Sequence, residues 1–152
     1  MEPINWFMNV VTQHYFDFRG RARRAEFWWY ALVYTILYAA LHLIGSIVHV
    51  GSLLSFAFWL ALLLPSLSVA ARRLHDTGRN GWLVLIALVP ATCWNIMTYG
   101  AGATGAVFGA HMPPGIFGWI TLVAAVVMVY FFVQPGAKGD NSYGSDPKAG
   151  LA

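Results

Sequence analysis

Four long apolar segments, separated by short polar ones, dominate the pattern of the chain. Each holds close to the ~20 residues with which a helix crosses ~30 Å of hydrocarbon. Backbone amides in lipid must find partners within a helix or a closed barrel, and a barrel would show alternating strands of about 10 residues. The pattern therefore predicts an all-α integral membrane bundle of four transmembrane helices in a single membrane domain, residues 1–152. The predicted spans are 27–47, 53–71, 82–99 and 116–134.

Composition agrees with this pattern. Hydrophobic residues make up 59% of the chain and charged residues 10%, against roughly 45–50% and roughly 25% in soluble domains. A water-soluble domain of this size could not cover its surface with so few charges, so the bilayer must solvate much of it. The single cysteine, Cys93, excludes an internal disulfide.

The basic residues orient the bundle. They occur in three places, before the first span, between the second and third, and after the fourth: Arg19, Arg21, Arg23, Arg24; Arg72, Arg73, Arg79; Lys138, Lys148. With four spans all three places lie on one side of the membrane, and the other side carries no Lys or Arg. Because cytoplasmic loops are enriched in basic residues, the sequence predicts cytoplasmic N- and C-termini. Residues 135–152 then form a cytoplasmic tail, either an ordered turn or a short flexible segment.

The segment before the first span has a helical rather than a continuous apolar pattern. Its apolar residues recur at helical spacing, at Ile4, Phe7, Met8, Val11, Tyr15 and Phe18. Residues 3–18 are therefore predicted to form an N-terminal interfacial amphipathic helix with its apolar face in the bilayer. The alternative is a helix packed on the cytoplasmic face of the protein itself.

Three polar strings stand at the predicted cytoplasmic face: GRARRAEFWW after the N-terminal helix, RRLHDTGRNGW between the second and third spans, and PG–G–N–YG–DP after the fourth. Together they resemble the bacterial inner-membrane proteins grouped as domain of unknown function 805. The resemblance covers nearly the whole chain, with Asn80 where serine is commoner and a long Gly/Ala-rich outer loop as departures. It implies a multi-span protein of the bacterial inner membrane and brings no established activity.

The cytoplasmic strings also hold the best candidates for binding. An arginine-rich collar is predicted at one membrane depth, from Arg21, Arg23, Arg24, Glu26, Arg72, Arg73, His75, Asp76 and Arg79. Arginine offers a planar fork for phosphate, and each basic residue near an anionic membrane contributes about 1 kcal/mol. The collar is therefore a candidate site for anionic phospholipid or a membrane protein partner. Alternatively, these arginines set the topology and pair with Glu26 and Asp76 to tie the loops together.

Catalysis has little support in the sequence. His75 and Asp76 are adjacent, so on a helix they point about 100° apart, and no nucleophile–base arrangement or set of metal ligands is recognisable. The GAGATG string, residues 100–105, lacks the preceding strand that a dinucleotide site needs. We expect no enzyme activity, no cofactor, no metal and no nucleic-acid partner.

A polar stripe runs along the first span, at Tyr30, Tyr34, Tyr38 and His42, and should face other helices. Further polar groups lie near prolines, at Ser66 and Ser68 and at Thr92, Cys93 and Asn95. These groups either line a substrate path or hydrogen-bond to one another. Gly118, Thr121 and Ala125 give the fourth span a small-residue face suited to packing within or between subunits.

Two functions of different class follow. The first is a non-catalytic inner-membrane module that binds anionic lipid or a membrane partner through the collar. The second is a small transporter or channel subunit that acts as an oligomer through the polar stripe.

Overall fold

A computed structural model of the chain describes residues 2–47, 51–99 and 116–149. Within these ranges the chain is all-α, as predicted, apart from one isolated bridge between Asn141 and Gly144. The helices are α1 (Pro3–Gln13), α2 (Arg24–Ile47), α3 (Gly51–Asp76), the short 3-10 helix η1 (Gly81–Val84), α4 (Leu85–Tyr99) and α5 (Ile116–Val133). The GAGATG string lies outside the described residues.

The chain divides into two compact units. The first comprises Met1–Gly81 together with Pro135–Ala152, so the tail after α5 returns to the unit that holds α1, α2 and α3. The second comprises Trp82–Gln134 and contains α4 and α5. Every Asp, Glu, Lys and Arg of the chain belongs to the first unit.

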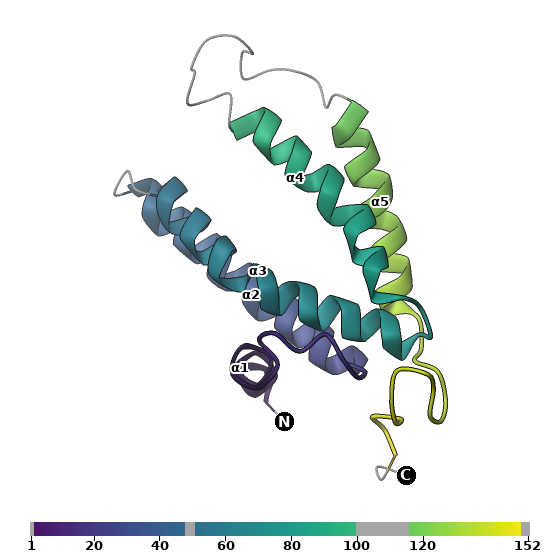
Figure 1. The fold of residues 1–152 in the computed structure, drawn as a ribbon. Coiled ribbons are helices and arrows are strands. Elements are labelled where there is room, and N and C mark those ends of the chain that lie inside the picture. The colour runs from purple at the N-terminus through teal and green to yellow at the C-terminus, as the bar shows by residue number, and fades with distance from the viewer. Residues whose placement is uncertain (1, 48–50, 100–115, 150–152) are drawn as a thin grey trace. The chain divides into compact units, whose positions relative to one another are not determined.

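α2 and α3 form an antiparallel hairpin (Figure 1). Aromatic residues fill much of the interface, where the Tyr34 ring lies 5.5 Å from the Phe58 ring. Tyr30, Leu62 and Val69 are buried in the same core. Among the described residues, two segments are long and apolar enough to cross a membrane, Arg24–Gly45 and Ala57–Asp76. The other two predicted spans coincide with shorter apolar helical segments, Gly81–Cys93 and Gly118–Val133.

Pro65 interrupts the hydrogen bonding of α3. Proline has no N–H, so the carbonyl four residues earlier, on Ala61, loses its helical donor. The Tyr15 hydroxyl donates to that carbonyl at 2.5 Å. One position further on, the Ser66 hydroxyl donates to the Leu62 carbonyl at 2.6 Å. The Tyr15 hydroxyl thus replaces the backbone donor that Pro65 lacks.

α1 lies across α2 and α3, and Figure 1 shows it end-on while the other two helices are seen from the side. Phe7 and Val10 are buried, and the Phe7 ring stacks on Tyr30 with 5.3 Å between ring centroids. The alternative of a helix packed on the protein itself is therefore confirmed for this side of α1. Ile4 and Met8 remain about half exposed.

The predicted extent of this first helix, residues 3–18, is wrong beyond Gln13. The carbonyls of His14 and Asp17 each lie 2.7 Å from the Ser68 hydroxyl of α3, which takes the place of helical donors. Gly20 then turns the chain with a φ of 78°. The predicted stripe also omitted Val10, although its side chain is fully buried.

The other predicted boundaries shift by a few residues. α2 begins at Arg24 instead of residue 27, and α3 continues to Asp76 instead of ending at residue 71. The predicted third span opens as 3-10 helix before α4 begins at Leu85. In the second unit, the buried positions of α5 are Ala124, Met128 and Phe132, at four-residue spacing. The exposed Ala125 of the predicted small-residue face is not one of them.

Candidate functional site

Residues far apart in sequence meet where α3 ends. Asp76 accepts from the Nε of Arg21 at 3.1 Å through Oδ1 and from the Nη1 of Arg73 through Oδ2. All three side chains are buried, and Arg73 has no exposed surface. We call Arg21, Arg73 and Asp76 the arginine–aspartate cluster. Because two guanidinium groups share one carboxylate, the cluster is a structural centre rather than an open binding surface.

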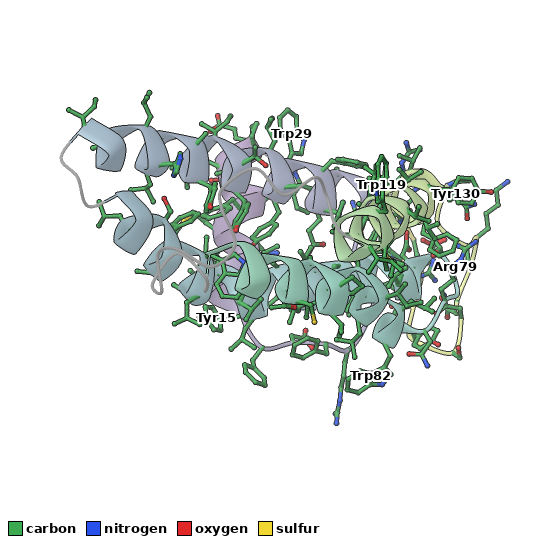
Figure 2. All side chains as sticks on the ribbon, turned by 90° about the horizontal axis from the view of Figure 1, so that it is seen from above. Tyr15, Trp29, Arg79, Trp82, Trp119 and Tyr130 are labelled. Carbon is green, nitrogen blue, oxygen red and sulfur yellow. The ribbon has the colours of Figure 1, made fainter. Side chains whose placement is uncertain are left out.

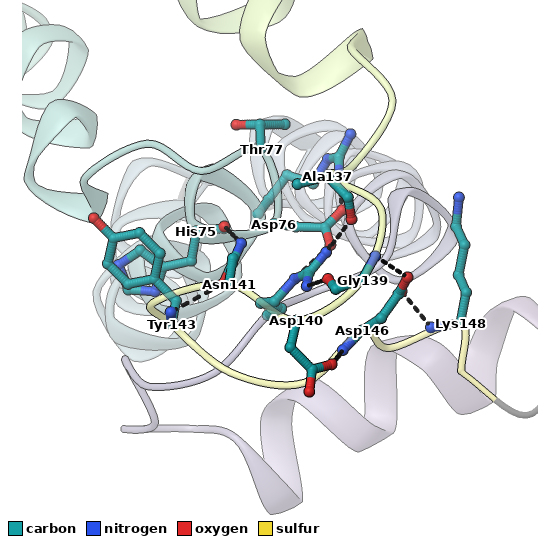
Figure 3. A network of polar contacts seen from close by, with 12 residues as sticks. His75, Asp76, Thr77, Ala137, Gly139, Asp140, Asn141, Tyr143, Asp146 and Lys148 are labelled. Carbon is teal, nitrogen blue, oxygen red and sulfur yellow. Dashed lines mark hydrogen bonds and ion pairs between the residues drawn. The ribbon is translucent and has the colours of Figure 1, made fainter.

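The C-terminal tail closes over this cluster (Figure 3). The Nη1 and Nη2 atoms of Arg21 donate to the carbonyls of Gly139 and Ala137 at 2.6 and 2.5 Å. The Ala137 N–H donates in turn to the Asp76 carbonyl at 2.7 Å. At Gly136 an added Cβ would clash with the Asp76 carboxylate, so only glycine fits there. The ordered-turn interpretation of the tail is confirmed for its described part.

His75 faces different partners from its neighbour Asp76. Its Nδ1 lies 3.1 Å from the Gly20 carbonyl, which requires the Nδ1–H tautomer for a hydrogen bond. The Tyr143 ring stacks on the imidazole with 4.0 Å between centroids and 5° between planes. The Asn141 amide donates to the backbone carbonyl of His75 at 2.9 Å. His75 therefore binds the tail to the turn that precedes α2.

The tail also stabilises its own turn. The Asp146 carboxylate accepts from the backbone N–H groups of Lys148 at 2.9 Å and Gly139 at 3.0 Å. These bonds lower the pKa of Asp146 below its ordinary value, because they favour the charged form. The Asp140 carboxylate likewise accepts from the Asp146 N–H at 3.0 Å.

A second buried ion pair joins α2 to α3. The Nη1 of Arg72 lies 2.8 Å from Oε1 of Glu26, which stands in the first turn of α2. The Arg72 carbonyl accepts from the Ala22 N–H at 3.0 Å, so the chain entering α2 runs along this part of α3. Arg72 is 3% exposed, yet its Nε and Nη2 atoms have no hydrogen-bond partner among the residues that the structure describes. Buried guanidinium nitrogens without partners are uncommon and call for an explanation.

The predicted collar therefore does not form a single surface. The predicted pairing with Glu26 and Asp76 is confirmed, and lipid or partner binding stays a prediction. Arg24 is exposed, while Arg23, His75 and Arg79 are half-buried; Arg21, Glu26, Arg72, Arg73 and Asp76 are buried. Outside the predicted set, Arg19, Lys138 and Lys148 are exposed. Sequence reasoning missed the tail residues Gly136, Asn141 and Tyr143, although the PG–G–N–YG–DP string was their visible signal.

The polar stripe of α2 is a ladder of stacked rings. Centroid distances are 6.2 Å from Tyr30 to Tyr34, 6.1 Å from Tyr34 to Tyr38 and 6.4 Å from Tyr38 to His42. At one end the Tyr30 hydroxyl lies 2.8 Å from the Ser66 hydroxyl of α3. At the other end the His42 Nδ1 lies 3.5 Å from the Ser55 hydroxyl. Both ends of the stripe thus have polar partners on α3.

Among the described side chains, no group of three or more His, Cys, Asp and Glu residues is placed to hold a metal ion. Of the polar groups near Pro90, the Thr92 hydroxyl donates to the Leu88 carbonyl within α4. The side chain of Asn95 lies outside the described set.

The segments that meet at the arginine–aspartate cluster all lie within the stretch of the chain that matches one known family. Residues 15–145 match the family described as "Protein of unknown function (DUF805)". The chain belongs to this family. Inner membrane protein YhaI of Escherichia coli strain K12 is 33% identical over 148 residues, which cover 97% of this chain and 98% of the relative. Inner membrane protein YhaH of the same strain is 29% identical over 95% of this chain and 98% of its own length.

A further relative, uncharacterized protein YiiR of the same strain, is 28% identical over 90% of each chain. No solved structure matches the chain. YhaI and YhaH support a location in the bacterial inner membrane, and the names of the three relatives assign no activity.

Proposed function

We propose that this DUF805 protein is a non-catalytic, four-span inner-membrane module that binds anionic phospholipid through its exposed arginines. The arginines concerned are Arg19, Arg23 and Arg24, at the entrance to α2. The observation that carries the proposal is the division of the arginines: Arg19, Arg23 and Arg24 are exposed or half-buried, whereas Arg21, Arg72 and Arg73 form internal ion pairs.

The surroundings of the exposed arginines suit a membrane interface. Trp28 and Trp29 follow Arg24 by four and five residues, and each is 38% exposed. Figure 2 shows Trp29 projecting from the outer side of α2. Tryptophan is enriched at headgroup level, and basic residues beside it attract anionic lipid. A fully cytoplasmic position of all basic residues requires four spans and both termini inside, and this topology is part of the proposal.

The position of α1 fits the same membrane depth. Phe7 stacks on Tyr30, which stands six residues after Arg24, or about 9 Å along α2. Interfacial helices lie about 5–10 Å below the headgroup boundary. The exposed Ile4 and Met8, four residues apart on α1, then face acyl chains. The interfacial and the packed interpretations of α1 are thus compatible, each applying to a different side of the helix.

The transporter or channel alternative uses the polar stripe instead. The polar atoms of Tyr30 and His42 contact Ser66 and Ser55 on α3. These contacts favour the interpretation of the stripe as a packing element. Tyr38 and His42 are exposed, however, and a second copy of the chain could cover them. Flux measurements in proteoliposomes test this alternative directly, with Tyr38→Phe and His42→Ala as the variants.

The lipid proposal is tested by competitive binding in nanodiscs of phosphatidylcholine with or without phosphatidylglycerol, read by native mass spectrometry of retained lipid. The test variant is Arg23→Gln with Arg24→Gln. The matched control is Lys138→Gln with Lys148→Gln, which removes the same charge from the exposed tail. We expect the test variant to lose roughly 2 kcal/mol of preference for phosphatidylglycerol, or about thirtyfold in affinity, and the control to lose much less. Equal retention of both lipids by the unaltered protein would refute the proposal.

A further inference from the structure

We infer that the connection between α1 and α2 is an aromatic wedge, with Phe16 and Phe18 at its tip, that inserts among the acyl chains of the cytoplasmic leaflet. Its partner is lipid hydrocarbon, whereas the exposed arginines of the proposed function attract the phosphates of the headgroups. The inference rests on the four-span topology of that proposal and is independent of lipid binding by the arginines.

Two phenylalanines stand at the surface of this connection. Phe16 is 68% exposed and Phe18 is 36% exposed. The two rings pack edge to face on each other, with 5.6 Å between centroids. Burial of a phenylalanine ring away from water is strongly favourable, and neighbouring exposed apolar side chains mark a surface that another apolar phase covers. The pair therefore calls for an apolar environment outside the protein.

Contacts with α3 fix the level of the wedge along the hairpin. The carbonyls of His14 and Asp17, on either side of Phe16 in the chain, each lie 2.7 Å from the Ser68 hydroxyl. Ser68 precedes Arg72 by four residues on α3, or about 6 Å along the helix. The backbone that carries Phe16 therefore lies about one helical turn further into the apolar part of α3 than Arg72.

This level decides which partner the wedge meets. Apolar faces of interfacial segments lie about 5–10 Å below the headgroup boundary, so a wedge one turn beyond the arginines reaches the acyl chains. A cytoplasmic protein would have to extend past the headgroups to contact Phe16. Lipid hydrocarbon, in contrast, is present at this level around every spanning helix.

The neighbouring part of α3 presents an apolar surface of its own. The hydroxyl of Tyr15, adjacent to Phe16 in the chain, donates to the Ala61 carbonyl at 2.5 Å, and the preceding Leu60 is 53% exposed. Figure 2 shows Tyr15 beside α3, while Trp29 projects from the outer side of α2. Aromatic groups suited to the interface therefore stand on two sides of the hairpin.

The polar groups of the connection are compatible with this position. The Asp17 carboxylate lies 2.9 Å from the His14 Nδ1 and accepts from the Arg19 N–H at 3.1 Å, so its charge has partners within the connection itself. Arg19 is exposed. Its long side chain can extend to the headgroups while its backbone stays nearer the acyl chains.

Spin labels test the wedge in liposomes of phosphatidylcholine and phosphatidylglycerol. The label is attached at Phe16→Cys in a Cys93→Ser background, and its collisions with oxygen and with a water-soluble nickel chelate are measured. Oxygen partitions into hydrocarbon, whereas the chelate stays in water. We expect the ratio of oxygen to chelate collisions at Phe16→Cys to approach that at Ile36→Cys, an exposed apolar position of α2. It should exceed severalfold the ratio at Ser142→Cys, the control on the exposed tail.

The outcomes separate this inference from the proposed function. If Ile36→Cys reports hydrocarbon and Phe16→Cys reports water, the wedge is overturned while the spanning hairpin stands. A label shielded from both reagents would also overturn it, because protein would then cover the wedge; dilution with unlabelled protein would show whether that protein is a second copy. Should Phe16→Cys not fold, Phe18→Cys carries the same expectation. Equal retention of both lipids in the nanodisc assay, together with a hydrocarbon signal at Phe16→Cys, would refute binding by the arginines and leave the wedge intact.

Discussion

Replacing Asp76 with asparagine tests whether the arginine–aspartate cluster holds the first unit together. The substitution keeps the shape of the side chain but removes the charge that Arg21 and Arg73 share. Removing one partner of a buried ion pair typically costs about 3–5 kcal/mol, because the remaining charge is left uncompensated. The carbonyls of Ala137 and Gly139 continue to accept from Arg21, so we expect the lower end, about 3 kcal/mol.

The assay is reversible unfolding in mixed micelles with increasing dodecyl sulfate, followed by far-ultraviolet circular dichroism. Glu2→Gln makes the same chemical change at an exposed carboxylate and should stay within about 0.5 kcal/mol of the unaltered protein. Adding Arg73→Gln to Asp76→Asn should cost less than the two single effects combined, because it also removes one uncompensated charge. A loss below about 1 kcal/mol for Asp76→Asn, or strict additivity in the double variant, would show that the buried contacts contribute little.

Three further outcomes are expected. Gly136→Ala places a methyl group against the Asp76 carboxylate and should cost about 1–3 kcal/mol, with faster proteolysis of the tail; a tail as resistant as before would contradict the close contact. Tyr30→Phe loses a hydrogen bond to α3 and should cost about 1 kcal/mol in the same unfolding assay, whereas Tyr34→Phe should be near neutral. The pKa of Asp146 is lowered by backbone N–H donors, so its stabilisation of the tail is present above the ordinary carboxyl pKa and lost as pH falls through the lowered value. An NMR titration of the carboxyl carbon and the tail amides checks this, and an ordinary pKa there would contradict the bonding.

The sequence predicted the helical class and the approximate helices, because long apolar runs leave lipid-facing backbone no other regular structure. It did not predict the helix ends. The first helix stops at Gln13 because Ser68, more than fifty residues away, supplies a polar partner for the carbonyls of His14 and Asp17. α3 continues past residue 71 because Arg72 pairs with Glu26 of α2 and Asp76 with Arg21 of the preceding segment. Arg73 pairs with Asp76 within α3 itself. A hydropathy pattern reflects the cost of placing a charge in lipid. It contains no information on ion-pair or hydrogen-bond partners that come from distant parts of the chain.

The division of the collar into buried and exposed arginines depends on the register of α2 against α3. Tyr30 of α2 contacts Ser66 of α3. Glu26 lies one turn before Tyr30 on α2, and Arg72 lies six residues after Ser66 on α3. Because the helices are antiparallel, these two charged side chains pair with each other. Continuing the same register beyond the helix start brings Arg21 to Asp76. In the described part of the chain, Arg23 and Arg24, two and three residues further along than Arg21, form no ion pair with a carboxylate across the hairpin. Residue type alone cannot distinguish these arginines, because all carry the same charge and lie close together in the sequence. A slip of one helical turn would move Glu26 away from Arg72 and leave a buried guanidinium unpaired, at a cost of about 3–5 kcal/mol. The ion pairs therefore fix the register, and the register in turn determines which arginines remain outside the internal ion pairs.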